Sequence, residues 1–557
     1  MSLKEIELLK RKYEGLYKCL RKKRKLLDME KSFLHDYKNL DKYVEKRNVS
    51  FIKRKRKEYD VLNHINGYPL DEYQSRVVLS DEEASLVVAG AGSGKSLTII
   101  GKIVYLVLVC GVKPEDILCI SFTNDATINL KKNIAKNYNF DINIYTFHKL
   151  ALEILKQNGI EYVIAPDHFL QEIIERFFKN VVPYNKVFDT CLKRVLGKDY
   201  SDKEFLNLKR LIGTFISLFK GNNYDLNYFL KILKKLKFSF RFKEKRHDKA
   251  LLLLIINVYL YYQDELEKEN ALDFNDMINK SIGVLKEKGL KKYWKYIIVD
   301  EYQDTSMVKF EMISQIIKIT GAKFLAVGDD FQSIYRFTGC DLHIFLNFTK
   351  YFQNAKVFQI VNTYRNPQEL IQVAGDFVMR NKAQQRKKLV SAKHLDKPVV
   401  VYYQDDKVRA LKDLLVKLDK DMCKEIMVLG RNNKDINMYV DASFKQEGDM
   451  FSYKGICFRY LTIHKSKGLE SENVILINME DRLLGMPTQI KDEKILRFVN
   501  NTKDYYPFEE ERRLFYVAIT RTKNRTYIIS PTKGESVFVK EIVRDKKNVK
   551  VIKKVNC

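Results

Sequence analysis

The sequence predicts an α/β protein with two parallel-sheet domains, a helical insertion and an N-terminal helical extension. From about residue 84 onward, short apolar runs alternate with helical patterns, which is typical of parallel sheets covered by helices. Residues 150–270 read instead as lysine-rich helices, and residues 1–60 carry heptad-like apolar spacings. The apolar runs are too widely spread for a single sheet and lie at residues 84–90, 116–122, 296–301, 323–329, 356–361, 473–479 and 525–530.

The composition is that of a globular protein with an anionic partner. The 557 residues include 100 Lys+Arg against 71 Asp+Glu, and the net charge of +29 favours nucleic acid as that partner. The eight cysteines are scattered without a CxxC pair, which argues against a disulfide framework or zinc ribbon and favours a reducing compartment. The sequence starts without a signal-peptide pattern, and its longest uncharged apolar stretch, residues 250–262, is too short to cross a bilayer. We therefore expect a cytoplasmic protein without a membrane partner.

Residues 1–66 are expected to form a basic helical extension. The first 60 residues hold 20 Lys+Arg and 10 Asp+Glu, which is about a third of the excess charge. Their apolar spacing predicts one or two long helices in a coiled coil or hairpin. Two interpretations stay open: a solvated helical element packed on the body, or an arm that binds a partner.

A phosphate-binding loop follows the first apolar run. Residues 84–88 lead into a glycine-rich segment and then into a helical stretch. Glycines let backbone N–H groups converge on phosphate oxygens at the start of a helix, where the helix dipole favours anions. Lys95 is expected to reach the β- and γ-phosphates of ATP, and the Ser96 hydroxyl to ligate Mg²⁺. The expected cofactor-binding loop comprises Ala89, Gly90, Ala91, Gly92, Ser93, Gly94, Lys95 and Ser96.

The second half of an ATPase site is expected where the apolar residues 296–299 end in two acidic residues. Asp300 would hold Mg²⁺ through water, and Glu301 is placed to polarise the attacking water. The pair alone would be unspecific. Its position directly after a buried strand, with the phosphate-binding loop upstream, predicts ATP hydrolysis with Mg²⁺.

The run Asp300-Glu-Tyr-Gln-Asp-Thr305 resembles the DE-x-QDT motif of superfamily 1 helicases of the UvrD/Rep/PcrA type. The other motifs of that family have counterparts in the same order, so the resemblance covers residues 67 to about 530. The short interval of about 95 residues between the fourth and fifth motifs makes the layout most similar to the DNA helicase IV branch. The counterparts are residues 70–74, 121–124, 146–148, 273–276, 327–335, 362–365, 462–470 and 510–521.

The resemblance implies two RecA-like P-loop domains. The first, domain 1A, would comprise residues 67–149 and 271–355, and the helical insertion 1B would comprise residues 150–270. The second, domain 2A, would comprise residues 356–557, with a reduced 2B-like insertion near residues 395–458.

The resemblance also implies roles at the nucleotide. Gln74 would read the adenine edge with its amide, Tyr364 would stack on the base and Glu470 would contact the ribose. Gln332 would sense the γ-phosphate, which Arg365 and Arg521 would reach as arginine fingers, because guanidinium is always charged and binds phosphate oxygens bidentately. The expected catalytic set is Lys95, Asp300, Glu301, Gln332, Arg365 and Arg521.

At the nucleic acid, the resemblance implies that Tyr335 and Phe337 stack on bases of single-stranded DNA. Base–aromatic stacking of about 1–3 kcal/mol per base gives a grip that does not depend on sequence. The residues expected to line the strand are Phe122, Thr123, Asn124, His148, Tyr335, Phe337 and His464.

The implied activity is that of an ATP-dependent DNA helicase or translocase that moves 3′→5′ on single-stranded DNA and meets single-strand/double-strand junctions. Two alternatives stay open. One is a helicase-like ATPase that acts on a protein partner such as RNA polymerase through residues 1–60. The other is a translocase that unwinds only together with a partner nuclease.

Overall fold

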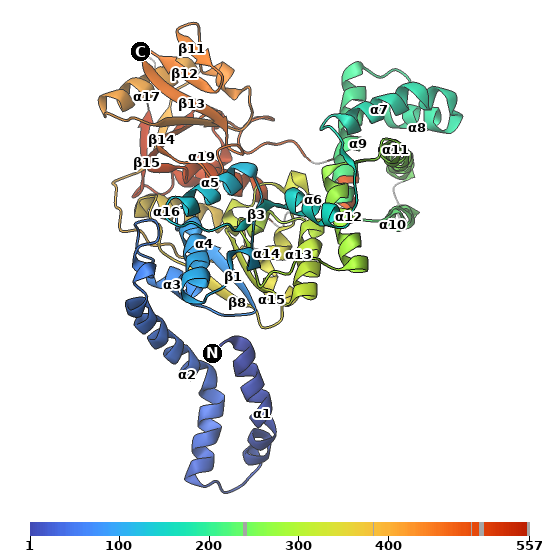
Figure 1. The fold of residues 1–557 in the computed structure, drawn as a ribbon. Helices are drawn as coiled ribbons and strands as arrows, with labels where there is room; N and C mark the ends of the chain where they lie inside the picture. Colours follow the sequence, from blue (N-terminus) through green and yellow to red (C-terminus); the bar gives the residue numbers. More distant parts are fainter. Residues whose placement is uncertain (238–241, 383, 492, 501–505, 554–557) are drawn as a thin grey trace.

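The computed structural model describes residues 1–237, 242–382, 384–491, 493–500 and 506–553. Two sheets, a helical insertion and an N-terminal helical hairpin make up the molecule (Figure 1). Within the described residues, no helix combines the length and apolarity that a bilayer crossing requires.

The first sheet is six-stranded and fully parallel, in the order β3-β2-β6-β7-β1-β8. Its strands are β1 (Ala84–Ala89), β2 (Ile117–Ser121), β3 (Asn143–Thr146), β6 (Tyr296–Val299), β7 (Lys323–Gly328) and β8 (Lys356–Ile360). The helices of this domain include α4 (Lys95–Val104), α5 (Asn124–Ala135), α6 (Phe147–Gln157), α12 (Phe274–Lys288) and α13 (Met307–Thr320). Trp294, the one tryptophan of the sequence, is buried in this domain's core.

Two expected domain boundaries are wrong. The run at residues 356–361 does not open the second domain, because β8 pairs in parallel with β1 at the edge of the first sheet. The insertion does not begin at residue 150, because Leu150 and Ile154 of α6 are buried in the first domain's core. The short strands β4 (Val163–Ile164) and β5 (Ala271–Leu272) pair with each other and mark where the chain enters and leaves the insertion.

The second sheet has eight strands in the order β11-β12-β13-β10-β14-β15-β9-β16. Its strands are β9 (Val399–Tyr403), β10 (Ile426–Gly430), β11 (Phe444–Glu447), β12 (Met450–Tyr453), β13 (Ile456–Thr462), β14 (Ser471–Leu476), β15 (Thr522–Ser530) and β16 (Val549–Lys553). The helices α16 (Gln368–Val378), α17 (Lys407–Lys420), α18 (Glu509–Ile519) and α19 (Val537–Ile542) pack on it.

The reduced 2B-like insertion expected near residues 395–458 is also wrong. The strands β9 and β10 in this segment are fully buried, and α17 joins them as part of the second domain itself. Only the β11–β12 hairpin extends beyond the parallel strands, as an antiparallel edge of the sheet.

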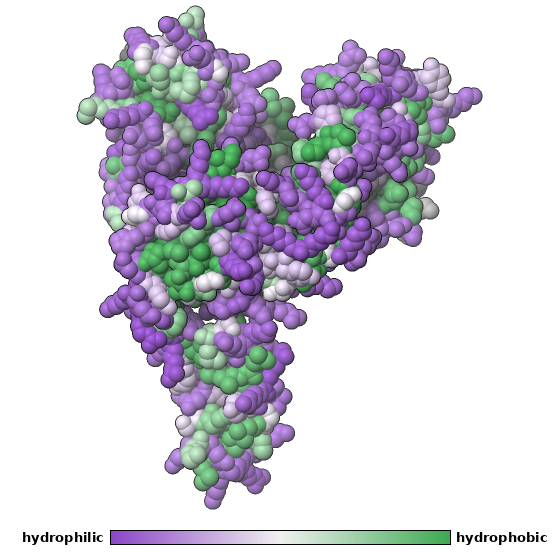
Figure 2. Space-filling view, in the orientation of Figure 1, coloured by the Kyte–Doolittle hydropathy of each residue, from purple (hydrophilic) through white to green (hydrophobic). Residues whose placement is uncertain are grey.

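The insertion is a cluster of helices with its own apolar core. Its helices are α7 (Phe169–Asn180), α8 (Lys186–Leu196), α9 (Asp202–Gly221), α10 (Leu226–Lys237) and α11 (Phe242–Lys268). Figure 2 shows the surface hollowed between the second domain, at the upper left, and this insertion, at the upper right.

The N-terminal segment is a hairpin of α1 (Leu3–Arg21) and α2 (Asp28–Glu58) that projects from the first domain (Figure 1). Tyr17 of α1 stacks on Tyr37 of α2, with ring centroids 4.3 Å apart. At the base of the hairpin, the Leu3 N–H donates to the Glu82 carboxylate over 2.8 Å, and Lys356 pairs with Glu45 of α2. Glu82 precedes β1 and Lys356 begins β8, so the hairpin attaches where the strands start.

Candidate functional site

The glycine-rich loop joins β1 to α4, as the strand–loop–helix pattern predicts. Gly92 and Gly94 have φ values of +69° and +76°, which side-chain-bearing residues rarely adopt. A Cβ on Gly94 would lie 2.6 Å from Nε2 of Gln74, and one on Gly92 would lie 2.4 Å from Cβ of Arg365. The loop therefore needs glycine both for its path and for the close approach of two segments that carry expected nucleotide contacts.

The acidic pair lies at the carboxyl end of β6, facing this loop. Oε1 of Glu301 is 3.8 Å from Nζ of Lys95, and the Glu301 N–H donates to Oδ1 of Asp300 over 2.9 Å. Burial and the neighbouring Glu301 charge raise the pKa of Asp300. Burial acts the same way on Glu301, but Lys95 and Lys467 outweigh it and lower the pKa of that carboxyl, so Glu301 carries the negative charge.

The oxygen donors at this place suit Mg²⁺. Ser96 is exposed in the otherwise half-buried first turn of α4, and Asp300 supplies a carboxylate directly before Glu301, which pairs with Lys95. Mg²⁺ prefers such hard oxygen ligands and is usually held by few protein groups together with nucleotide phosphates. The residues present therefore fit the ion.

Arg521 and Gln332 meet between the two domains. Nη2 of Arg521 donates to Oε1 of Gln332 over 3.0 Å, and the other acceptors of this guanidinium are the carbonyls of Val517 and Leu469. Arg521 is only 1% exposed, and burial followed by repulsion from Arg365 lowers its pKa to about 9. A buried cation whose hydrogen-bond acceptors are neutral oxygens provides a strong binding site for an anion.

Arg365 and Glu470 lie together at the site, but each has the other as its partner. Nε of Arg365 donates to Oε2 of Glu470 over 2.7 Å, and Lys523 lies 3.3 Å from the other carboxylate oxygen. The expected phosphate contact of Arg365 and the expected ribose contact of Glu470 would therefore replace an existing ion pair.

On the side of the site expected to hold the adenine base, the side-chain amide of Gln74 makes its hydrogen bonds to the protein itself. Its Nε2 donates to the Ser93 carbonyl over 3.1 Å, and its Oε1 accepts from the N–H of Asp71. The Tyr364 hydroxyl donates to Asp71 over 2.8 Å while 60% of Tyr364 remains exposed. Tyr364 thus presents a ring surface to a base, whereas Gln74 also fixes the start of α3 (Glu72–Val78) against the loop.

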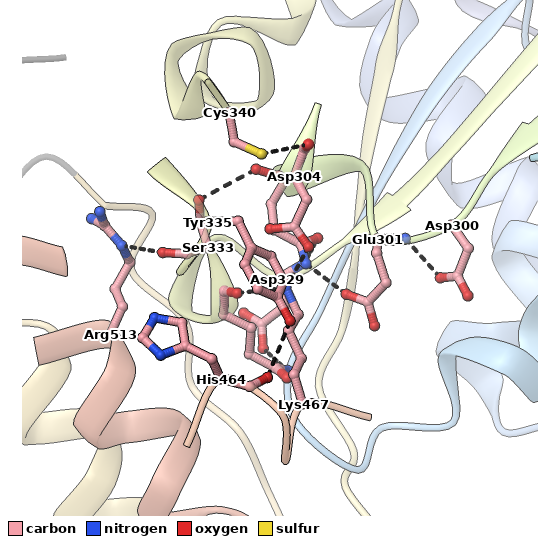
Figure 3. A network of polar contacts seen from close by, with 12 residues as sticks. Asp300, Glu301, Asp304, Asp329, Ser333, Tyr335, Cys340, His464, Lys467 and Arg513 are labelled. Atoms are coloured by element: carbon pink, nitrogen blue, oxygen red, sulfur yellow. Dashed lines mark hydrogen bonds and ion pairs between the residues drawn. The ribbon is translucent and has the colours of Figure 1, made fainter. Parts of the chain in front are cut away.

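Three of the expected strand-lining residues form one aromatic group. Ring centroids of Tyr335 and Phe337 are 6.1 Å apart, and His464 lies 5.6 Å from Phe337. The Tyr335 hydroxyl donates to the His464 carbonyl over 3.1 Å (Figure 3). Phe337 is 60% exposed, whereas burial and then Arg431 lower the pKa of His464 to about 4, so this imidazole is neutral at physiological pH.

The other four expected strand residues lie in the first domain, and their availability differs. Phe122 is half-buried with its ring centroid 5.1 Å from that of Phe147, and the Thr123 hydroxyl caps α5 by accepting from the Ala126 N–H. Asn124 is exposed at the start of the same helix. The ring centroid of His148 is 4.9 Å from that of Phe274, and burial, with Lys309 nearby, lowers the pKa of His148 to about 4. Thr123 and Asn124 are therefore exposed, whereas Phe122 and His148 are half-buried.

Sequence reasoning missed Lys467, which connects the nucleotide and strand groups. Its buried ammonium pairs with Asp304 and donates to the Gln332 carbonyl over 2.7 Å (Figure 3). It also lies 5.0 Å from the ring centroid of Tyr335. Although burial opposes it, the charges of Asp304 and Glu301 raise the pKa of Lys467. The signal was its position inside the 462–470 motif, between His464 and Glu470.

A second missed feature is a cleft of about 1400 Å³ beside Phe337 and His464. Arg431 and Asn432, directly after β10, and Lys465 bring cationic and amide groups to its wall. The signal was the Arg-Asn-Asn run after a buried strand. A second missed lysine, Lys387, pairs with the buried Asp329 and Asp330, and no sequence pattern pointed to it.

The chain matches two protein-family models. The UvrD/REP helicase N-terminal domain model matches residues 70–353, and the UvrD-like helicase C-terminal domain model matches residues 456–533.

Individual relatives carry related names. The chain is 28% identical to DNA helicase IV of Escherichia coli over 520 residues, which cover 87% of this chain and 72% of the relative. It is 28% identical to a probable DNA helicase of Mycoplasma pneumoniae over 481 residues, 83% of each chain. It is 29% identical to the ATP-dependent DNA helicase Rep of Buchnera aphidicola subsp. Baizongia pistaciae over 387 residues, 66% of this chain and 52% of the relative.

Proposed function

The chain belongs to the UvrD/REP helicase family and is an ATP-dependent DNA helicase of the UvrD/Rep/PcrA type, and from this premise we propose how its residues work. We propose that it moves 3′→5′ along single-stranded DNA as ATP is hydrolysed between its two RecA-like domains. The DNA substrates are single strands and their junctions with duplex.

The observation that carries this proposal is the continuous polar path from the nucleotide loop to the aromatic group. Lys95 faces Glu301, which accepts from Gln303, and Gln303 in turn accepts from the N–H of Asp329. Gln332 donates to the Asp329 carboxylate, and Lys467 joins the Gln332 carbonyl to the ring of Tyr335. These residues come from both domains. The loss or gain of the γ-phosphate can therefore alter the position of Tyr335 at the strand through these direct contacts.

Each residue has a distinct part in turnover. Lys95 and the N–H groups at the start of α4 bind the β- and γ-phosphates, and Glu301 accepts the proton of the attacking water. Arg521, and Arg365 once released from Glu470, neutralise charge on the transferred phosphoryl group. Mg²⁺, when bound through Ser96 and Asp300, would supply the remaining charge neutralisation at the phosphates.

At the strand, Phe337 and Tyr335 provide stacking surfaces and His464 a neutral imidazole. The cleft next to them adds the exposed ammonium of Lys465, which suits backbone phosphates, and Arg431, whose guanidinium is paired with Glu511 over 2.9 Å. A grip made of stacking and phosphate contacts is independent of sequence, as a moving motor requires.

The test is the ATPase rate with single-stranded DNA, duplex DNA and RNA, paired with unwinding of duplexes that carry a 3′ or a 5′ tail. We expect strong stimulation by single-stranded DNA and unwinding of the 3′-tailed duplex. Unwinding of only the 5′-tailed duplex would contradict the direction, and an ATPase indifferent to DNA would contradict the motor.

The position and the exposed side chains of the N-terminal hairpin support a second function, the binding of a protein partner. It attaches where the strands of the first sheet begin, whereas the phosphate loop and Tyr335 follow the strands' carboxyl ends. At its tip, Leu27 and Met29 are 69% and 86% exposed beside the basic residues 21–25. Exposed apolar side chains next to cations suit a protein surface with acidic and apolar groups better than a DNA backbone.

A further inference from the structure

A segment of the second domain crosses to the helical insertion and is buried there. The chain leaves the second sheet after β14 and returns at α18, and between them η9 (Lys494–Phe498) lies among the insertion helices. Ile495, Leu496 and Val499 are 2%, 8% and 0% exposed and belong to the same apolar core as α7 and α9. We call the described residues 480–491, 493–500 and 506–508 the strap.

Polar contacts from three insertion elements hold η9 in a defined seat. Nδ2 of Asn222, at the end of α9, donates to the Val499 carbonyl over 2.8 Å, and the Tyr228 hydroxyl of α10 donates to the Phe498 carbonyl over 2.7 Å. Arg497 pairs with Asp248 of α11 over 3.2 Å. The buried side chains and these contacts together make the seat specific.

The strap is equally fixed at the second domain. Met486 is fully buried and its carbonyl accepts from the Ser536 hydroxyl, and the Thr488 N–H donates to Glu511 over 3.2 Å. Ile495 in the seat follows Thr488 by seven residues in the sequence, and seven extended residues span at most about 25 Å. The second domain and the insertion therefore cannot move farther apart than this reach unless one end of the strap detaches.

The strap borders the space next to the aromatic group. The cleft beside Phe337 and His464 is also lined by strap residues Arg482, Gln489 and Lys491. η7 (Arg336–Thr338), which carries Phe337, packs against α9 of the insertion, and Arg336 pairs with Glu510 of α18 over 3.1 Å. Insertion, first domain, second domain and strap thus contact one another in a closed circuit, and the cleft beside Phe337 and His464 borders the strap.

We infer that the strap encloses the single strand in a protein ring. This inference rests on the proposed strand path past Phe337 and His464. A linear strand leaves such a ring by sliding out through its ends. A circular strand leaves only when η9 detaches from its seat on the insertion, which is also the step that admits it.

The test compares the lifetimes of complexes with closed-circular and linear single-stranded DNA of the same sequence and length, without ATP and after challenge with excess competitor. We expect the wild-type complex to last at least about ten times longer on the circle. The double variant Leu496→Asp/Val499→Asp should reduce the circular lifetime to the linear one. Its ATPase at saturating DNA should stay within about twofold of wild type. The control Leu483→Asp adds a charge to an exposed strap residue away from the seat and should change neither lifetime.

Equal wild-type lifetimes on circle and line would overturn the ring, as would an unchanged ratio in the double variant. If the charged variant unfolds the insertion, the variant Tyr228→Phe/Arg497→Ala weakens the seat without placing a charge in the core. It should shorten the circular lifetime about two- to fivefold, and an unchanged lifetime would again overturn the ring. A wild-type protein that binds neither DNA form contradicts the proposed function, a result distinct from these.

Discussion

The interdomain network and the N-terminal hairpin are both rich in charge, but they use it differently. Arg521, Gln332 and the side chain of Lys467 are buried, and their partners come from segments far apart in the sequence. In the hairpin, Lys18 pairs with Glu14 one turn away, and both side chains are largely exposed. Exposed pairs contribute little, whereas removing one member of a buried network leaves its partners unsatisfied. A high density of charged residues therefore does not identify the residues of the motor. Charged and polar side chains that are buried between the two domains do identify them.

The largest effect is expected for Arg521→Ala. Loss of this buried cation should lower DNA-stimulated ATP turnover about 10³- to 10⁵-fold, as expected for a group that neutralises charge on the transferred phosphoryl. The measurement is the steady-state ATPase rate at saturating single-stranded DNA. Arg459→Ala removes an exposed arginine of the same domain and should leave the rate unchanged. Retained turnover in Arg521→Ala would remove this residue from the site.

Glu301→Gln should reduce turnover about 10²- to 10⁴-fold, because the amide cannot accept the proton of the attacking water. ATP binding should persist, since Lys95 and the loop are intact. Single-turnover hydrolysis and equilibrium binding of a fluorescent ATP analogue separate the two quantities. Glu447→Gln, on the exposed β11–β12 edge, is the matched control. Turnover at the wild-type rate would contradict the proposed base.

Tyr335→Ala should weaken single-strand binding about 5- to 150-fold, which corresponds to the roughly 1–3 kcal/mol of one stacked base. Binding of ATP without DNA should stay near normal. Fluorescence anisotropy with a labelled oligonucleotide gives the DNA affinity, and Tyr351→Ala, a partly exposed tyrosine at the end of α15 (Phe348–Tyr351), serves as the control. A collapse of ATP binding would show that the two roles are not separable at this residue.

The smallest effect is expected from the hairpin. If the hairpin binds protein and not DNA, deleting residues 1–60 should hardly change the salt dependence of DNA affinity. The slope of log DNA affinity against log salt concentration should stay within about one unit of the wild-type slope. The DNA-stimulated ATPase should likewise stay within about twofold. A clearly shallower slope would show that the hairpin binds the nucleic acid. The hairpin and the interdomain network would then no longer differ in their partner.

Much of the motor could be predicted because its signals are local. Each of the seven apolar runs is a strand, and the phosphate loop lies between β1 and α4 as its pattern requires. The boundary errors arose where pairing is not local: the run at 356–361 reads the same whether its strand joins the first sheet or the second. The sequence does not show that residues 395–458 belong to the second domain, because β9 and β10 lie between the motifs and contain no motif residues.

The rest of the site could not be read from the sequence for a related reason. The seat of η9 joins Val499 to Asn222, and nothing in the Ile-Leu-Arg-Phe-Val run says that its partner lies in the insertion. Lys387 likewise becomes meaningful only when folding places it on Asp329 and Asp330. Patterns identify residues that act through their neighbours in sequence, whereas these residues act through neighbours in space.

The central claim is that the nucleotide site and the strand path are one connected unit through Lys467. The most direct measurement is the affinity for single-stranded DNA with and without a non-hydrolysable ATP analogue, in wild type and in Lys467→Ala. Because coupling between two bound ligands is reciprocal, we expect the analogue to shift the wild-type affinity about 5- to 150-fold and the variant's affinity far less. A wild-type affinity that ignores the analogue, or a variant that responds as wild type does, would contradict the claim.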